Sequence, residues 1–167
     1  MPLLTPHPGA RSDRDGAAGF SMVELMVVLT ILAILIAVAV PSLLGATKPA
    51  ADRRAETLLH TALLAGRAAA GDRDTYLGVG PGDLSTAEHS IRFVTASQDA
   101  ESVRNEVSVR TGTIGGADFL LVATRSASGR CFALLDRSDA PTAFRADGAA
   151  SCRAEAFDPA GAWGAAW

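Results

Sequence analysis

The chain has 167 residues, a formal net charge of −3 at pH 7 and 20% charged residues. This length suits one ordinary domain, and the balanced charge excludes both a strongly basic nucleic-acid-binding protein and an acidic tail. Apolar residues make up 49% of the chain but aromatic residues only 5%, so the apolar share is mainly aliphatic.

The aliphatic residues are concentrated in one segment near the amino terminus. Leu25–Val40 contains a single polar residue, Thr30, and the apolar stretch extends over residues 20–44. A transmembrane helix needs about 20 consecutive apolar residues, so this stretch is long enough to cross a bilayer. The sequence therefore argues against a purely soluble cytosolic protein.

Three interpretations of this segment compete: a cleaved secretory signal, a permanent membrane anchor, and a helix that leaves the membrane for a protein assembly. A secretory signal has a basic start and a small-x-small cleavage site. Residues 37–39, Ala-Val-Ala, offer such a site. The start has no net positive charge, because two arginines are offset by two aspartates: Arg11, Arg14, Asp13 and Asp15. The pattern thus disfavours a secretory signal.

An acidic residue, Glu24, lies inside the apolar stretch, four residues after Phe20. A carboxylate in the hydrocarbon layer costs on the order of 2 to 3 kcal/mol even on the most lenient scale. Glu24 should therefore have a partner or a function if it enters this layer. At the headgroup boundary the cost of burying the carboxylate is small. Glu24 can lie at this boundary at one stage and in the apolar layer at another.

The residues around Glu24 resemble the amino-terminal signature of type IV prepilins and pseudopilins. Gly19 is followed by Phe-Ser-Met-Val-Glu-Leu-Met-Val-Val-Leu and then by the rest of the apolar run. A small residue, an aromatic residue, an acid at fixed spacing and a long apolar run coincide, so the match is specific over residues 19–45. The resemblance implies that prepilin peptidase, a membrane aspartic protease, cuts after Gly19, removes the leader 1–19 and methylates the new amine of Phe20.

The resemblance also implies assembly with other copies of the chain and with minor pilins, through an inner-membrane platform and an assembly ATPase. The chain would be a single-pass protein of the cytoplasmic membrane before assembly and part of a surface filament afterwards. The Phe20 amine and the Glu24 carboxylate would then share a low-dielectric layer, where an unpaired charge is strongly disfavoured. We expect Glu24 of an incoming subunit to pair with the Phe20 amine of a subunit already in place and so to set the register.

Two prolines follow the apolar run. Pro41 lacks an amide proton, so a kink or a local loosening of the helix is expected there. Pro49 suits the first turn of a resumed helix, with Thr47 or a neighbour as its cap. The hydrophobic helix for membrane and assembly is expected over residues 20–45. Over residues 46–70 apolar and polar side chains recur at helical spacing, which predicts an amphipathic helix that continues into a head.

Residues 71–167 are expected to form a globular, β-rich head. The sequence Ser-Thr-Ala-Glu at residues 85–88 has the pattern of a capping box for a brief helical turn. Turn signals at Gly115-Gly116 and Ser128-Gly129 favour a small antiparallel meander. With the long amino-terminal helix this gives an α+β, pilin-like fold. Strands are predicted at residues 91–96, 106–111, 119–125 and 131–135.

The chain has two cysteines, Cys131 and Cys152. A bond between them would stabilise the head by roughly 3 kcal/mol, and export to an oxidising compartment favours it. Two free or buried thiols are the alternative. Residues 126–132, together with Cys152 and the tryptophans at 163 and 167, also resemble the heads of pilins from high-GC Gram-positive bacteria. We expect these tryptophans to cap the core or to lie on the surface of the head.

The sequence contains no recognised catalytic or metal-binding pattern. Its three histidines are isolated, and residues 78–82 lack the Lys-Ser/Thr of a phosphate loop. Asp72 and Asp74 share one polar loop, where carboxylates are far more often solvated than bound to calcium. We therefore expect no enzyme, no cofactor and no metal.

The expected function is that of a structural subunit of a type IV pilus, a filament for adhesion, motility or DNA uptake. A pseudopilin of a type II secretion system is the nearest alternative, and the carboxyl-terminal cysteines favour the pilus over it. A signal-anchored extracytoplasmic enzyme or binding protein is the alternative from another class. DNA binding needs a basic stripe, and acidic residues interleave with the arginines of the head: Arg125, Arg130, Arg137, Arg145 and Arg153.

Overall fold

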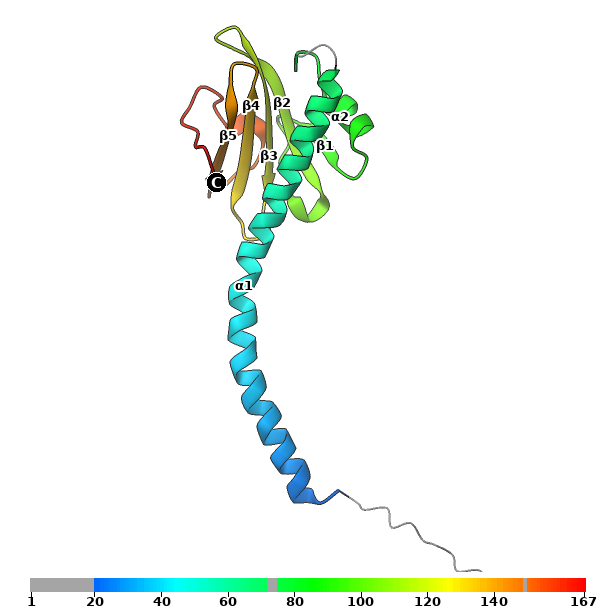
Figure 1. Ribbon diagram of the computed structural model, residues 1–167, viewed down its shortest axis with the longest axis vertical. Helices are drawn as coiled ribbons and strands as arrows, with labels where there is room; N and C mark the ends of the chain where they lie inside the picture. Colours follow the sequence, from blue (N-terminus) through cyan, green and yellow to red (C-terminus); the bar gives the residue numbers. More distant parts are fainter. Residues whose placement is uncertain (1–19, 72–74, 149) are drawn as a thin grey trace, which may run out of the picture. The chain divides into compact units, whose positions relative to one another are not determined.

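A computed structural model describes residues 20–71, 75–148 and 150–167, and within 40–46 it describes the backbone alone. The chain comprises two compact units, Met1–Pro41 and Ser42–Trp167. One helix, α1 (Met22–Ala70), runs from the first unit into the second (Figure 1). The predicted leader 1–19 lies outside the described residues.

In the first unit α1 is apolar on all sides. The window Met22–Ala39 is long and apolar enough to cross a membrane, and none of it is buried within the chain. A helix of this kind requires lipid or other protein around it, because a helix exposed to water keeps a polar face. The first unit therefore contains the predicted membrane-spanning segment.

The backbone of α1 is helical at both prolines. The expectation that a new helix begins near Pro49 is therefore wrong. Proline removes one amide hydrogen bond, and the uninterrupted turns on both sides of Pro49 hold the backbone in the helical conformation. The kink predicted at Pro41 stays a prediction, because Pro41 ends the first unit and its side chain is not among those described.

The second unit contains a five-stranded sheet with the strand order β1-β2-β3-β4-β5. Strands β2 to β5 form an antiparallel meander, of which β2, β3 and β4 correspond to predicted strands. The turn between β2 and β3 uses Gly115 and Gly116, both at positive φ, which glycine adopts without strain. The predicted α+β, pilin-like fold is confirmed. The strands are β1 (Arg92–Thr95), β2 (Glu106–Ile114), β3 (Ala117–Arg125), β4 (Cys131–Arg137) and β5 (Ala140–Asp147).

Three details of the head differ from the prediction. β1 pairs with β2 in parallel, because the connection between them is a crossover that contains a short 3-10 helix (Ser102–Arg104) and not a tight turn. β5 has no strand signal in the sequence, since Ala140–Asp147 is rich in alanine and contains a proline. The helix α2 (Pro81–Ala87) begins earlier than the predicted turn, and Asp83 accepts a hydrogen bond from the Gly80 amide at 2.8 Å.

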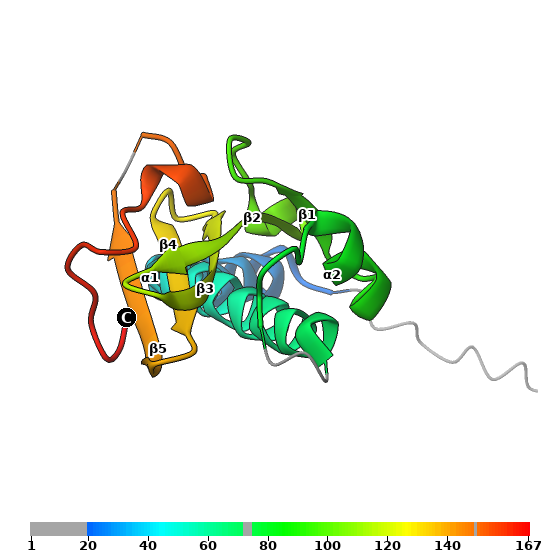
Figure 2. The same ribbon diagram turned by 90° about the horizontal axis from the view of Figure 1, so that it is seen from above.

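Both faces of the sheet are covered (Figure 2). The last part of α1 packs on one face, where Leu59 meets Leu120 and Val122 of β3 in a hydrophobic cluster. The segment after β5, with a second 3-10 helix (Ala154–Ala156), packs on the other face over Leu121 and its neighbours. Since successive side chains of a strand point to opposite faces, a strand buried on both faces reads as a continuous apolar run.

At Gly66, α1 lies directly against β3. A Cβ atom at this position would lie 2.2 Å from Leu120 Cδ2. Glycine inside a helix usually costs about 1 kcal/mol relative to alanine, so alanine would stabilise a helix with open space at this position. At position 66 the contact with Leu120 makes alanine less favourable than glycine.

We therefore expect Gly66→Ala to lower the free energy of unfolding of the head by about 1 to 3 kcal/mol, the usual cost of overpacking a core. Denaturant unfolding of the oxidised head measures the change. Gly82→Ala in α2 is the matched control, since a Cβ atom at that position would enter open space, and it should not destabilise. A Gly66→Ala head as stable as its parent would contradict the packing described.

Candidate functional site

The site predicted from the sequence lies at the start of α1, where Ser21 and Glu24 cap the helix. The Glu24 amide donates a hydrogen bond to Ser21 Oγ at 3.1 Å, and the Ser21 amide donates one to Glu24 Oε2 at 3.2 Å. These reciprocal bonds form a capping box, which satisfies two of the amides that the first turn of a helix leaves unpaired. The Glu24 carboxylate thus has a partner within its own chain.

Phe20 directly precedes this capping box, and the residue is 83% exposed. A cut before Phe20 would leave the capping box intact, with the new amine one residue from Ser21. Glu24 also lies in the first turn of α1, at the positive end of the helix dipole. The pattern Ser-x-x-Glu at residues 21–24 is the sequence signal of this capping box. From the sequence, Glu24 is predicted only to form a contact between subunits.

The predicted pairing of Glu24 with the Phe20 amine joins two copies of the chain and stays a prediction. Gly19, the other residue of the predicted cleavage site, lies outside the described residues. The site at the start of α1 therefore has three described members: the exposed Phe20, the cap residue Ser21 and the carboxylate of Glu24.

In the head, Cys131 and Cys152 form a disulfide, with Cα atoms 5.5 Å apart. Both residues are fully buried. Cys131 begins β4, and Cys152 lies in the segment that covers the second face of the sheet. The bond therefore ties this covering segment to the middle of the fold. For a loop of this length the chain-entropy model gives a stabilisation of about 3 kcal/mol.

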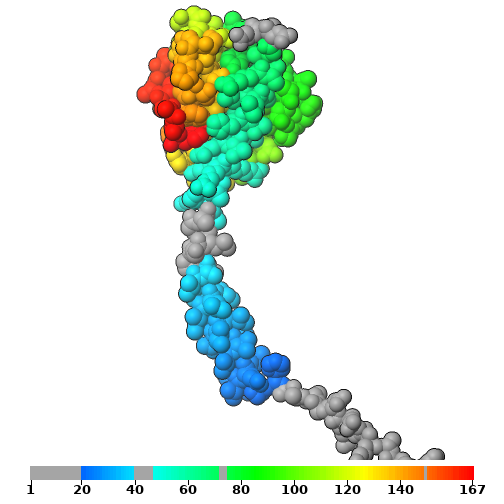
Figure 3. Space-filling model, in the orientation of Figure 1, coloured from blue at the N-terminus to red at the C-terminus, as the bar shows by residue number. Residues whose placement is uncertain are grey.

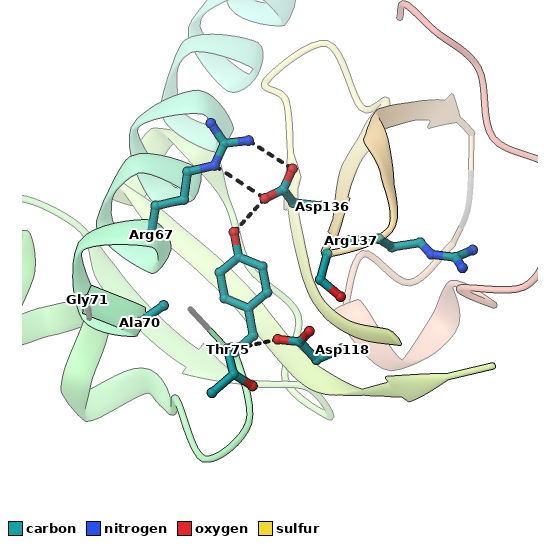
Figure 4. Close-up of a pocket in the computed structure, with 9 residues that line it drawn as sticks. Arg67, Ala70, Gly71, Thr75, Asp118, Asp136 and Arg137 are labelled. Carbon is teal, nitrogen blue, oxygen red and sulfur yellow. Dashed lines mark hydrogen bonds and ion pairs between the residues drawn. The ribbon is translucent and has the colours of Figure 1, made fainter. Parts of the chain in front are cut away.

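A polar cluster that the sequence interpretation misses fixes the end of α1 to the sheet (Figure 4). Asp136 of β4 is only 6% exposed. Its carboxylate accepts two hydrogen bonds from Arg67 of α1, the shorter at 2.9 Å, one from Thr142 of β5 at 2.6 Å and one from the Tyr76 hydroxyl. The cluster thus joins two strands, α1 and the loop that follows α1.

The protonation states of the cluster match its hydrogen bonds. Burial alone would raise the pKa of Asp136, but the hydrogen bonds from Arg67, Thr142 and Tyr76 outweigh it and hold this pKa below its usual value. Burial, together with the nearby Asp136 carboxylate, raises the pKa of Tyr76 to about 12. At neutral pH the phenol is therefore a donor and the carboxylate a charged acceptor.

A cavity of about 300 Å³ lies beside this cluster and also contacts Asp118 and Arg137. Asp118 accepts a hydrogen bond from the Tyr76 amide, and the side chain of Ser138 together with this amide lowers the pKa of Asp118. The carboxylates around the cavity are thus engaged by donors of the protein itself. In the part of the chain that the structure describes, no three His, Cys, Asp or Glu side chains are grouped to hold a metal ion.

The arginines near the carboxyl end of the head do not form an uninterrupted basic surface. Three of them lie within 2.8–3.5 Å of a carboxylate, in the pairs Arg130–Asp52, Arg137–Asp139 and Arg145–Asp147. Neighbouring carboxylates reduce the positive charge that a phosphate backbone would meet. The head therefore gives no support to DNA binding through this region.

Comparison with known proteins gives one family. Residues 14–40 match the prokaryotic N-terminal methylation motif, the class III signal peptide of type IV pilins. Comparisons with curated proteins and with solved structures give no match. The matched residues include Phe20, Glu24 and most of the apolar part of α1. The motif therefore indicates a prepilin similar to type IV pilins and pseudopilins over this amino-terminal part of the chain.

Proposed function

We propose that this chain is a structural subunit of a type IV pilus. Prepilin peptidase cleaves it after Gly19 and methylates Phe20, and the mature subunit polymerises through α1. The observation that carries the proposal is the methylation motif, which continues into an apolar helix with no buried residue in Met22–Ala39. The filament would serve adhesion, motility or DNA uptake.

The exposed helix can leave water in two ways. Fully burying one large aliphatic side chain is worth about 1.5 to 3 kcal/mol, so this surface is strongly driven into an apolar environment. A bilayer supplies that environment before assembly, and the same helix of neighbouring subunits supplies it afterwards. Ala33 and Ala37 are four residues apart, and small residues at this spacing let two helices approach closely. The helix thus suits both the membrane and a helical bundle.

The head suits a position outside the cell. Both faces of its sheet are covered, and a buried disulfide closes its carboxyl-terminal part. Disulfides persist in oxidising compartments, as the proposed surface location requires. Other copies of the chain, minor pilins, the inner-membrane platform and the assembly ATPase are the partners of this proposal.

Electron microscopy of surface filaments in a strain that lacks this chain tests the proposal. Filaments should be lost, and they should return when the complete chain is supplied in trans. Unchanged filaments together with impaired protein secretion would instead assign the chain to a type II secretion system as a pseudopilin. Supplying a Glu56→Gln chain, altered in the helix outside the methylation motif, is a matched control and should restore the filaments as the parent does.

A further inference from the structure

The carboxyl-terminal segment passes around one edge of the sheet. Trp163 packs on the face covered by the second 3-10 helix, with its ring centroid 6.2 Å from that of Phe157. Trp167 packs on the opposite face, with ring centroids 4.9 Å from Phe144 and 5.3 Å from Phe132. Figures 2 and 3 show this segment, in red, beside β5. We call residues 158–167 the edge clamp.

One pair of backbone hydrogen bonds joins the edge clamp to β5. The Phe144 amide donates to the Gly164 carbonyl oxygen at 2.8 Å, and the Gly164 amide donates to the Phe144 carbonyl oxygen at 2.9 Å. Since β4 pairs with the other side of β5, these groups of Phe144 face the outer edge of the sheet. Alternate residues of a regular antiparallel strand point the same way, so the amide of Ala146 faces this edge too.

The edge clamp is held in place at several points. A Cβ atom on Gly164 would lie 3.1 Å from the Ala166 carbonyl oxygen, so the absence of a side chain lets the edge clamp turn closely on itself at this point. The Trp163 indole donates a hydrogen bond to the Asp158 carbonyl oxygen at 3.1 Å. One tryptophan packs on each face of the sheet, and the hydrogen bonds between Gly164 and Phe144 lie between them. The edge clamp therefore contacts the sheet on both faces and at its edge.

The covered strand would otherwise be a surface for strand pairing. β5 has eight residues, and an edge strand of this length presents a row of amides and carbonyls that pairs readily with another strand. Pro141 and the irregular register opposite Leu135–Arg137 already interrupt the first half of this strand, so the part open to pairing is residues 143–147. A second copy of the chain offers the same strand, and two β5 strands can pair antiparallel about a two-fold axis.

We propose that the edge clamp closes the β5 edge against pairing with β5 of a second copy. Association of the heads through β5 is thereby blocked, and contacts between subunits are left to other surfaces. This inference rests on the head alone, so it holds whether or not the chain builds a pilus.

The oxidised head, residues 42–167, tests the proposal, because this unit contains both hydrophobic clusters and the disulfide. Two variants open the edge. Gly164→Pro removes the amide that bonds to Phe144, and a chain ending at Ala162 removes both tryptophans. Sedimentation velocity should show a monomer for the parent at every concentration and concentration-dependent dimers and larger species for both variants. In dilute samples, hydrogen exchange at the Phe144 amide should become about tenfold faster or more in the shortened head, which lacks the Gly164 carbonyl oxygen that accepts its bond.

Two further variants locate the contact. Ala162→Pro places a proline at an exposed position of the same segment and keeps the Gly164 amide, so this control should remain monomeric. Ala146→Pro, combined with the shortened chain, removes an edge-facing amide of β5 without altering its bonds to β4, and should restore the monomer.

The proposal is overturned if the folded, disulfide-bonded Gly164→Pro and shortened heads stay monomeric. It is also overturned if their association persists with Ala146→Pro, because the contact then lies on the surface that the tryptophans leave. If neither variant folds, the segment is a part of the core that folding requires. This outcome also contradicts the proposal that the segment serves to close the edge.

Discussion

Replacing Glu24 with valine should leave the chain inserted in the membrane and cleaved, and should abolish its polymerisation. In an assembled filament the Phe20 amine of one subunit and the Glu24 carboxylate of the next would share an apolar layer. Removing one partner of a buried ion pair costs about 3 to 5 kcal/mol, because the remaining charge has no partner. Immunoblots that compare processed subunit in sheared filaments and in membranes measure the effect.

Two companion variants separate pairing from helix capping. Ser21→Ala removes the hydroxyl that accepts a bond from the Glu24 amide and keeps the carboxylate. Its helix end should lose about 1 kcal/mol, and filaments should still form. Glu24→Gln keeps an oxygen that can accept the bond from the Ser21 amide but removes the charge, so it should fail to assemble as the valine variant does. Normal filaments from processed Glu24→Val protein would contradict the pairing between subunits and would leave helix capping as the role of Glu24.

Replacing Asp136 with asparagine should lower the free energy of unfolding of the head by about 3 kcal/mol at pH 7, because three donors lose a charged, buried acceptor. The asparagine amide would also direct its own donors at Arg67, Tyr76 or Thr142. Asp139→Asn in the neighbouring turn is the matched control. Its carboxylate is 50% exposed and pairs with Arg137 at 2.8 Å, and a surface pair of this kind contributes at most about 1 kcal/mol.

The Asp136 effect should depend on pH in one direction. The folded head holds the pKa of Asp136 below 3.8, the ordinary value, so its contribution to stability is complete above that pH. The contribution is lost as the pH falls through the lowered pKa of the folded state. Guanidinium unfolding at pH 7 and in the acid range should therefore give two free energies of unfolding, for the parent and for Asp136→Asn, whose difference becomes smaller below about pH 4. A difference that is constant with pH would contradict the assignment of a charged Asp136.

Local patterns in the sequence predict much of this fold. The apolar run of α1, the turn at Gly115-Gly116 and four of the strands follow from spacing and composition within short windows. The capping box at Ser21 and Glu24 is equally local, with its partners three residues apart. These features can be predicted because their physical causes lie among near neighbours in the chain.

The remaining features depend on contacts between distant residues. Asp136 bonds to Arg67 and Tyr76, which lie 69 and 60 positions away, and no short window contains these partners. β5 is weak in strand formers and becomes a strand by pairing with β4 on one side and with Gly164 on the other. The sequence predicts that the tryptophans cap the core or lie on the surface of the head. Their placement on opposite faces follows only from the folded path of the edge clamp.

The amino terminus of the subunit in assembled filaments tests the central claim most directly. Filaments sheared from the cell surface would be purified, and the first peptide of this chain would be identified by mass spectrometry. We predict a peptide that begins with N-methylated Phe20. A chain that begins at Met1, or a mature chain that begins at Val40, would contradict the account.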